Sequence, residues 1–144
     1  MAPRSFSRTV VSWNNCTITG NGNVQWVDGA WAGTNPAIGG KDTGNEISGG
    51  TIHGGDGGEP PLMIEGGVGD YIHNATISGP GPQGIVIYQV NTGGTNTCVN
   101  TNTFISGSGS TALGSAISSN SATNKGSGNS LNGLSSNLTA GACP

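Results

Sequence analysis

Apolar residues along this chain recur in one short phrase instead of in long blocks. The phrase has eight positions and reads apolar, any residue, Asn or Gly, small, Thr, apolar, polar, Gly. Five copies of it begin at Trp13, Ile47, Ile72, Val99 and Gly126, and the fifth copy is the weakest. The second apolar position falls at Ile18, Ile52, Ile77, Phe104 and Leu131, which lie 34, 25, 27 and 27 residues apart. Self-similarity at such a period is typical of proteins built from stacked repeats.

Alternation within the phrase predicts which side chains face a core. Side chains of a strand point to opposite faces in turn, so if the second apolar residue points inward, the Thr before it points outward. The residue two places before the apolar one, mostly small, then also points inward. Asn or Gly at the third position tolerates the left-handed backbone that a bend requires. We therefore expect the copies to stack in register, with the first apolar residues over one another and the second ones likewise.

A second strand is expected after each phrase, at Val24–Val27, Leu62–Ile64, Ile85–Val90, Leu113–Ile117 and Leu134–Leu138. The long first interval predicts a loop from Ala30 to Thr43, where Gly, Asn and Pro cluster. The pattern predicts an all-β fold, a short right-handed parallel β-helix of about five coils over residues 10–139. Residues 1–9 and 140–144 are expected to be tails. An antiparallel β-sandwich or jelly roll is the alternative, since short strands between Gly-rich turns suit it too.

Three segments carry a resemblance to a known family. The phrases NNCTITG and YIHNATISG, with the run GIVIY that follows the second, resemble coils of the pectate-lyase-like right-handed parallel β-helix superfamily. That superfamily includes polysaccharide lyases and hydrolases, bacterial adhesins and the shafts of bacteriophage tailspikes. The resemblance covers roughly residues 10–139 and implies the fold. It does not specify a function, because the phrase reflects packing between coils and not a catalytic site.

The composition limits the classes of partner that this chain is expected to bind. The 144 residues include 28 Gly and only four Lys or Arg, and the net charge is −3. Phosphate binding needs clustered basic residues, so no nucleic-acid partner and no polybasic membrane anchor are expected. No apolar stretch reaches 18 residues, and no signal peptide is seen at the N-terminus. Three cysteines leave either one disulfide with a free thiol or three reduced thiols.

Candidate chemistry is sparse. The seven acids are predicted to scatter around the fold as solvated loop carboxylates. Asp56 and Glu59, in the loop GGDGGEPP, are weak candidates for a cation or an acid/base pair, and a solubilising loop is favoured. His53 and His73 are expected to be exposed and too far apart to share a metal ion. No catalytic residue and no cofactor are predicted.

Aromatic residues suggest a different kind of site. Trp26, Trp31 and Tyr88 are candidates for stacking on a sugar ring, although a Trp that packs an open end of the fold is an equal alternative. The outward Thr row resembles the paired Thr columns of ice-binding β-helices. Only the first copy has Thr on both sides of its apolar residue, so an ordinary strand-favouring row is preferred.

The function predicted from these features is that of a non-enzymatic structural or adhesive surface protein. The open ends of a stacked fold need caps or partners, and no capping helix is seen. The concrete expectation is a bacteriophage virion component, such as a capsid decoration protein or a fibre or spike subunit, that assembles with other chains or copies of itself. Its expected location is a virion or another extracellular surface. The alternative is a glycan-binding or polysaccharide-depolymerase-like module.

Overall fold

The described part of the chain consists of short parallel strands. The computed structural model describes residues 12–15, 17–19, 30–33, 44–54, 58–65, 67–88 and 95–143. These residues form β-strands and one short 3-10 helix, η2 (Gly109–Thr111). Every pairing between the strands is parallel. The expected all-β fold is confirmed, and the antiparallel sandwich is wrong for this part of the chain.

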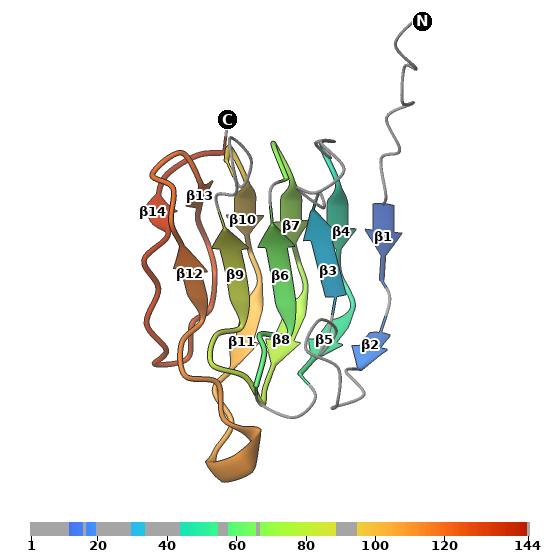
Figure 1. Ribbon diagram of the computed structural model, residues 1–144, viewed down its shortest axis with the longest axis vertical. Helices are drawn as coiled ribbons and strands as arrows, with labels where there is room; N and C mark the ends of the chain where they lie inside the picture. The colour runs from blue at the N-terminus through green and yellow to red at the C-terminus, as the bar shows by residue number, and fades with distance from the viewer. Residues whose placement is uncertain are drawn as a thin grey trace, which may run out of the picture.

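The strands form three sheets, and within each sheet the strands follow one another across the view of Figure 1. Sheet A contains, in order, β1 (Ser12–Asn14), β4 (Glu46–Ser48), β7 (Tyr71–His73), β10 (Cys98–Asn100), β13 (Lys125–Gly126) and β14 (Thr139–Ala140). Sheet B contains β2 (Thr17–Thr19), β5 (Thr51–His53), β8 (Thr76–Ser78) and β11 (Thr103–Ile105). Sheet C contains β3 (Ala30–Gly33), β6 (Leu62–Glu65), β9 (Ile85–Tyr88) and β12 (Ile117–Ser119). From β1 to β12 the chain visits sheets A, B and C in turn, and then returns to A.

The repeated phrases stack in register as the sequence predicts. In sheet A the residues paired in succession are Trp13, Ile47, Ile72 and Val99. In sheet B they are Ile18, Ile52, Ile77 and Phe104. An isolated parallel bridge between Thr103 and Ser130 continues sheet B into the fifth copy. The outward row is also in register, with Thr17, Thr51, Thr76 and Thr103 paired in succession.

One hydrophobic cluster contains residues from all three sheets. Its largest fully buried members are Phe104, Ile52, Leu62, Ile64, Ile72, Ile77, Ile85 and Ile87. Strands of two to four residues cannot bury an apolar face alone, so each repeat depends on its neighbours. Leu131, Leu134 and Leu138 of the last repeat pack against this cluster and are only partly buried.

Two residues turn the chain from sheet A into sheet B in each repeat. The first of the two has a positive φ in every copy of the phrase: Asn15 (55°), Gly49 (66°), Asn74 (57°), Thr101 (53°) and Gly128 (67°). The left-handed bend expected at the third position is therefore confirmed. Thr101 departs from the Asn or Gly pattern, and a β-branched residue is rarely found in this conformation.

The strands of sheet C match the expected positions in part. β6 and β9 lie where strands were predicted, although β9 ends at Tyr88. The loop expected from Ala30 is wrong at its start, because Ala30–Gly33 form β3 and pair with β6. The strand predicted at Leu113–Ile117 is also misplaced, since β12 begins at Ile117, in register with Ile85. The predicted strand at Val24–Val27 lies outside the described residues.

A disulfide joins Cys98 of β10 to Cys143, 45 residues later. The sequence left open whether any cysteines pair, and Cys16 lies outside the described residues. Closing a loop of this length in the unfolded chain typically contributes about 2–4 kcal/mol of stability. The bond ties residues 141–143 to sheet A. Helical structure in the described part of the chain is too short for a membrane crossing.

Candidate functional site

A cluster of polar and aromatic side chains lies on the outward face of sheet A. In β7 the central residue Ile72 is 1% exposed and points into the core. Its neighbours Tyr71 and His73 therefore point outward together, as the two-residue period of a strand requires. Their rings stack, with centroids 4.1 Å apart and planes at 17°. Glu46 of β4 is the register partner of Tyr71 and lies on the same face.

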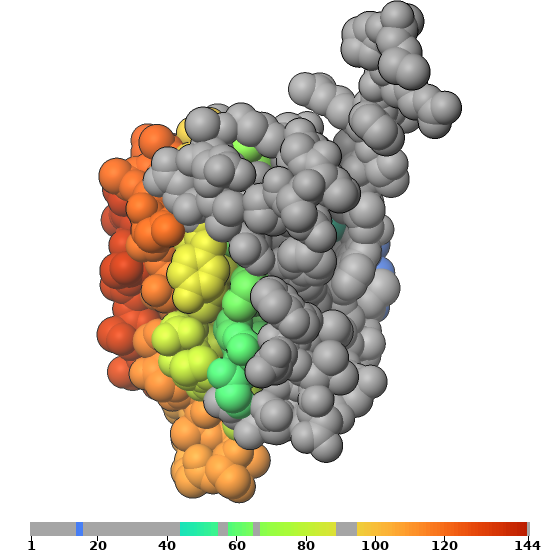
Figure 2. Space-filling model, viewed as in Figure 1, coloured from blue at the N-terminus to red at the C-terminus, as the bar shows by residue number. Residues whose placement is uncertain are grey.

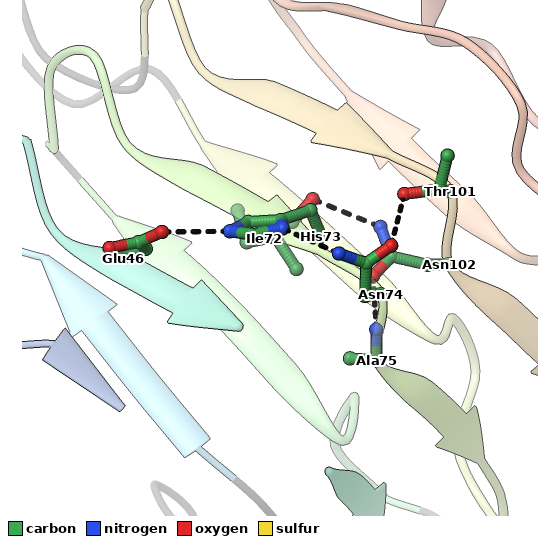
Figure 3. A network of polar contacts seen from close by, with 7 residues as sticks. All are labelled: Glu46, Ile72, His73, Asn74, Ala75, Thr101 and Asn102. Carbon is green, nitrogen blue, oxygen red and sulfur yellow. Dashed lines mark hydrogen bonds and ion pairs between the residues drawn. The ribbon is translucent and has the colours of Figure 1, made fainter. Parts of the chain in front are cut away.

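His73 is held at both ring nitrogens (Figure 3). Its Nε2 lies 2.8 Å from Glu46 Oε1, and its Nδ1 lies 2.9 Å from Asn74 Nδ2. Asn74 Oδ1 in turn accepts a hydrogen bond from Thr101 Oγ1 at 2.7 Å. An amide nitrogen only donates, so Nδ1 acts as an acceptor and Nε2 carries the proton that is donated to Glu46. The contacts select one neutral tautomer and fix the ring orientation.

The bend that follows β7 is fixed from its inner side as well. Asn102 is 1% exposed, and its Oδ1 accepts the N–H of Ala75 at 2.9 Å. Its Nδ2 donates to the carbonyl of Ile72 at 3.0 Å. The buried amide thus holds residues on both sides of His73 and Asn74 (Figure 3). Buried, fully bonded amides of this kind restrict the backbone around them.

The contacts of His73 leave the Glu46 side chain and the Tyr71 ring as the accessible parts of this cluster. Both nitrogens of His73 are engaged by neighbours, so neither is available to activate a nucleophile. The Glu46 side chain is 42% exposed, and its carboxylate can accept further hydrogen bonds from a ligand. Tyr71 is 38% exposed and presents an aromatic surface beside it. We call Glu46, Tyr71 and His73 the Tyr71 patch.

The aromatic residues singled out from the sequence lie on another sheet or outside the described residues. Trp31 is in β3 and Tyr88 ends β9, so both belong to sheet C but are separated by β6. Tyr88 is 46% exposed. Figure 2 shows that side of the molecule, with the surface over β6 and β9 in green to yellow. Trp26 lies outside the described residues, so this predicted glycan site stays a prediction.

The predicted acidic pair is described at one residue only. Glu59 is half-buried in its loop, and Asp56 lies outside the described residues. Within the part of the chain that the structure describes, no group of three or more His, Cys, Asp or Glu side chains is placed to hold a metal ion. His53 is on sheet B and His73 on sheet A, as expected for two histidines that do not share a ligand.

The expectation that all acids are solvated is wrong for Asp70. This residue is 2% exposed, and its Oδ1 accepts hydrogen bonds from the backbone and side-chain nitrogens of Asn45, at 2.9 and 3.0 Å. In the corresponding place two repeats later, Asn124 Oδ1 accepts the N–H of Thr97 at 2.9 Å. The residues just before β4, β7, β10 and β13 are all buried, and at Asp70 and Asn124 the polar side chain bonds to the backbone of the preceding repeat.

Sequence reasoning missed the Tyr71 patch although a signal was present. The segment Tyr71-Ile72-His73 places two ring-bearing residues around an inward Ile, which already puts both rings on the outer face. Glu46 precedes Ile47 as Tyr71 precedes Ile72, so the stacked register brings the three side chains together. The histidine that was expected to be an exposed row residue has a side chain only 15% exposed.

Comparisons with protein-family models, with curated proteins and with solved structures give no match to this chain. The resemblance to the pectate-lyase-like superfamily therefore rests on the repeated phrase alone.

Proposed function

We propose that this chain is a non-enzymatic structural or adhesive surface protein that assembles through one end of a short right-handed parallel β-helix. In this proposal each passage through sheets A, B and C is one coil, and about five coils stack along a common axis. Support comes from the repeated order of the sheets and from the core they share. The two ends of such a stack differ in a way that favours docking at the first one.

The last repeat is built to close its end. Gly126 leaves no side chain in the inward row of sheet A, and Leu138 occupies the space, with its Cδ2 2.6 Å from where a Cβ would lie. Leu131 and Leu134 also cover the core. The terminal strand β14 has only two residues, Thr139 and Ala140, and both are exposed. Short polar edge strands are a common protection against unwanted pairing.

The first repeat offers a longer edge. β1, β2 and β3 end their sheets on the side away from β14, and no described residue pairs with their outer side. Thr76 N donates to Gly50 O at 2.9 Å, and Thr103 N donates to Ala75 O at 2.9 Å, both in the preceding repeat. By the same register the N–H of Thr17 points away from β5. Within the described residues nothing pairs with this N–H, and an edge of this kind can pair with a strand of another chain; this observation carries the proposal.

The compartment proposed is a virion or another extracellular surface. Disulfides persist in oxidising surroundings and are rare in reducing cytosol, so the Cys98–Cys143 bond supports an outside location. The low charge, with 8% charged residues, and the 28 Gly suit a bacteriophage decoration, fibre or spike subunit. Both ring nitrogens of His73 are engaged by neighbouring side chains, which suits a structural role for this histidine.

The assembly proposal is tested by blocking the free edge. Thr17→Pro removes an N–H that faces outward and leaves the hydrogen bonds from β2 to β5 in place. We expect the wild-type chain to form oligomers in multi-angle light scattering at micromolar concentration, and Thr17→Pro to shift it toward monomer. Ala122→Pro is the matched control, because Ala122 is the second residue of an exposed turn closed by Asn124 N to Ser121 O at 3.3 Å.

Two results would contradict the proposal. The first is a wild-type chain that stays monomeric across that concentration range. The second is an oligomer that persists unchanged in Thr17→Pro while circular dichroism and thermal unfolding show that the variant is folded.

A further inference from the structure

The Tyr71 patch contains an aromatic ring that is partly open to solvent, since Tyr71 is 38% exposed. One face of the Tyr71 ring stacks on His73. On the other side along the chain, the residue two places before Tyr71 is Gly69, and the one two places before Glu46 is Gly44. A Cβ built at either glycine would have no atom within 4 Å. Neither glycine therefore has a side chain that could cover the phenol ring or the carboxylate.

The Tyr71 patch combines two features that favour binding of a sugar ring. The flat C–H face of a pyranose packs on an aromatic ring, and its hydroxyls donate to a carboxylate at the ring edge. Tyr71 supplies the ring, and the Glu46 side chain, which is 42% exposed, supplies the acceptor oxygens. Glu46 would repel an acidic sugar, and the chain carries a net charge of −3. The chemistry thus selects neutral pyranoses over uronic or sialic acids.

The patch is also held in place before any ligand arrives. His73 is fixed by Glu46 at 2.8 Å and by Asn74 at 2.9 Å, and the Tyr71 ring rests on it. A side chain that is already ordered loses little conformational entropy on binding. We propose that the Tyr71 patch is a binding site for a neutral pyranose unit of a surface glycan, with Tyr71 as the stacking platform, Glu46 as the hydroxyl acceptor and His73 as the positioning residue.

The test uses saturation-transfer NMR on the full chain with defined probes. These are the methyl glycosides of glucose, galactose, mannose and N-acetylglucosamine, with methyl glucuronide as the acidic probe. We expect at least one neutral glycoside to bind and the glucuronide to bind about tenfold more weakly or not at all. Tyr71→Ala should lower affinity for the bound glycoside by at least about tenfold, whereas Tyr71→Phe, which keeps the stacking face, should stay within about threefold.

Ile105→Ala is the control, because Ile105 is a large hydrophobic residue that is 48% exposed but lies on sheet B. It should leave binding unchanged. Absence of binding by all four neutral glycosides would overturn the proposal, as would unchanged binding in Tyr71→Ala. The inference does not depend on assembly, since the Thr17→Pro variant should bind the same glycoside equally well. Failure of one proposal is therefore distinguishable from failure of the other.

Discussion

Two rows of inward side chains run next to each other through the repeats, and they differ in chemistry. The core row of sheet B is apolar throughout, at Ile52, Ile77, Phe104 and Leu131. The bend row, two residues earlier in each repeat, reads Gly50, Ala75, Asn102 and Asn129. It changes from small residues to amides halfway along the stack. The same place in the repeat is thus filled in two ways.

The amides of the bend row repeat one geometry. Asn129 Oδ1 accepts the N–H of Asn102 at 3.0 Å, and its Nδ2 donates to Val99 O at 2.8 Å. Asn102 makes the corresponding pair of bonds to Ala75 and Ile72. Apolar burial is not directional, so the core row supplies cohesion without specifying register. The directional bonds of the bend row fix register in strands of only three residues, where a slip of one residue would turn every side chain over.

The largest loss in the free energy of unfolding is expected from a substitution in the core row. Phe104 is fully buried, and its ring packs against Gly84, where a Cβ would lie 2.8 Å from it. Phe104→Ala should lower the free energy of unfolding by about 3–5 kcal/mol, because a large cavity opens between repeats. Urea denaturation measures this change.

Ile105→Ala is the control for that measurement. Ile105 is the next residue in the same strand, but it is 48% exposed, so the expected loss is about 0.5 kcal/mol or less. Equal losses in the two variants would mean that Phe104 does not lie in a shared core.

Substitution in the bend row is expected to lower the free energy of unfolding somewhat less than substitution in the core row. Asn102→Ala leaves the N–H of Ala75 and the carbonyl of Ile72 without their buried partner. Each such group costs about 1–3 kcal/mol, so unfolding should become easier by about 2–4 kcal/mol. Asn100→Ala, measured in the same denaturation series, is the control. Its Oδ1 accepts an exposed N–H from Ser127 at 2.8 Å, and water can replace that bond. A loss at Asn102 no larger than that at Asn100 would show that the bend row does not hold the register.

The core row could be predicted from the sequence because its signal is a repeated residue type at a repeated place. Ile18, Ile52 and Ile77 share a phrase, so their pairing follows from alignment of the copies alone. The positive φ of Asn74 follows from the same alignment, since few other residues tolerate it. Strand positions in sheet C were harder to predict, because β3 lies in a Gly- and Asn-rich segment within the longest interval between two phrases.

Side-chain contacts between repeats could not be predicted from alignment of the phrases. The burial of Asp70 depends on Asn45, 25 residues away, and nothing local distinguishes Asp70 from a solvated loop acid. The disulfide joins Cys98 to a residue outside every phrase. The Tyr71 patch needed the register to be applied to outward residues as well as inward ones. Such pairings depend on which side chains meet across the stack, which the pattern along a single repeat does not contain.

The smallest change in the free energy of unfolding is expected at the position with positive φ between sheets A and B. There Thr101 replaces the Asn or Gly found in the other repeats. Thr101 has φ 53°, whereas the corresponding residues are Asn74 at 57° and Gly128 at 67°. A β-branched residue in the left-handed region is strained by about 1–3 kcal/mol. Thr101→Asn should therefore raise the free energy of unfolding by about 0.5–1 kcal/mol, after subtraction of the exposed hydrogen bond from Thr101 Oγ1 to Asn74 Oδ1.

The reverse exchange, Asn74→Thr, sharpens this prediction because it moves the same two residue types in the opposite direction at an equivalent bend. It introduces the strain and also removes the amide that holds His73, so it should lower the free energy of unfolding by about 1–2 kcal/mol. Both variants are compared by urea denaturation at one pH. Changes of the same sign at the two bends would mean that the residue type at this place does not control the turn between sheets A and B.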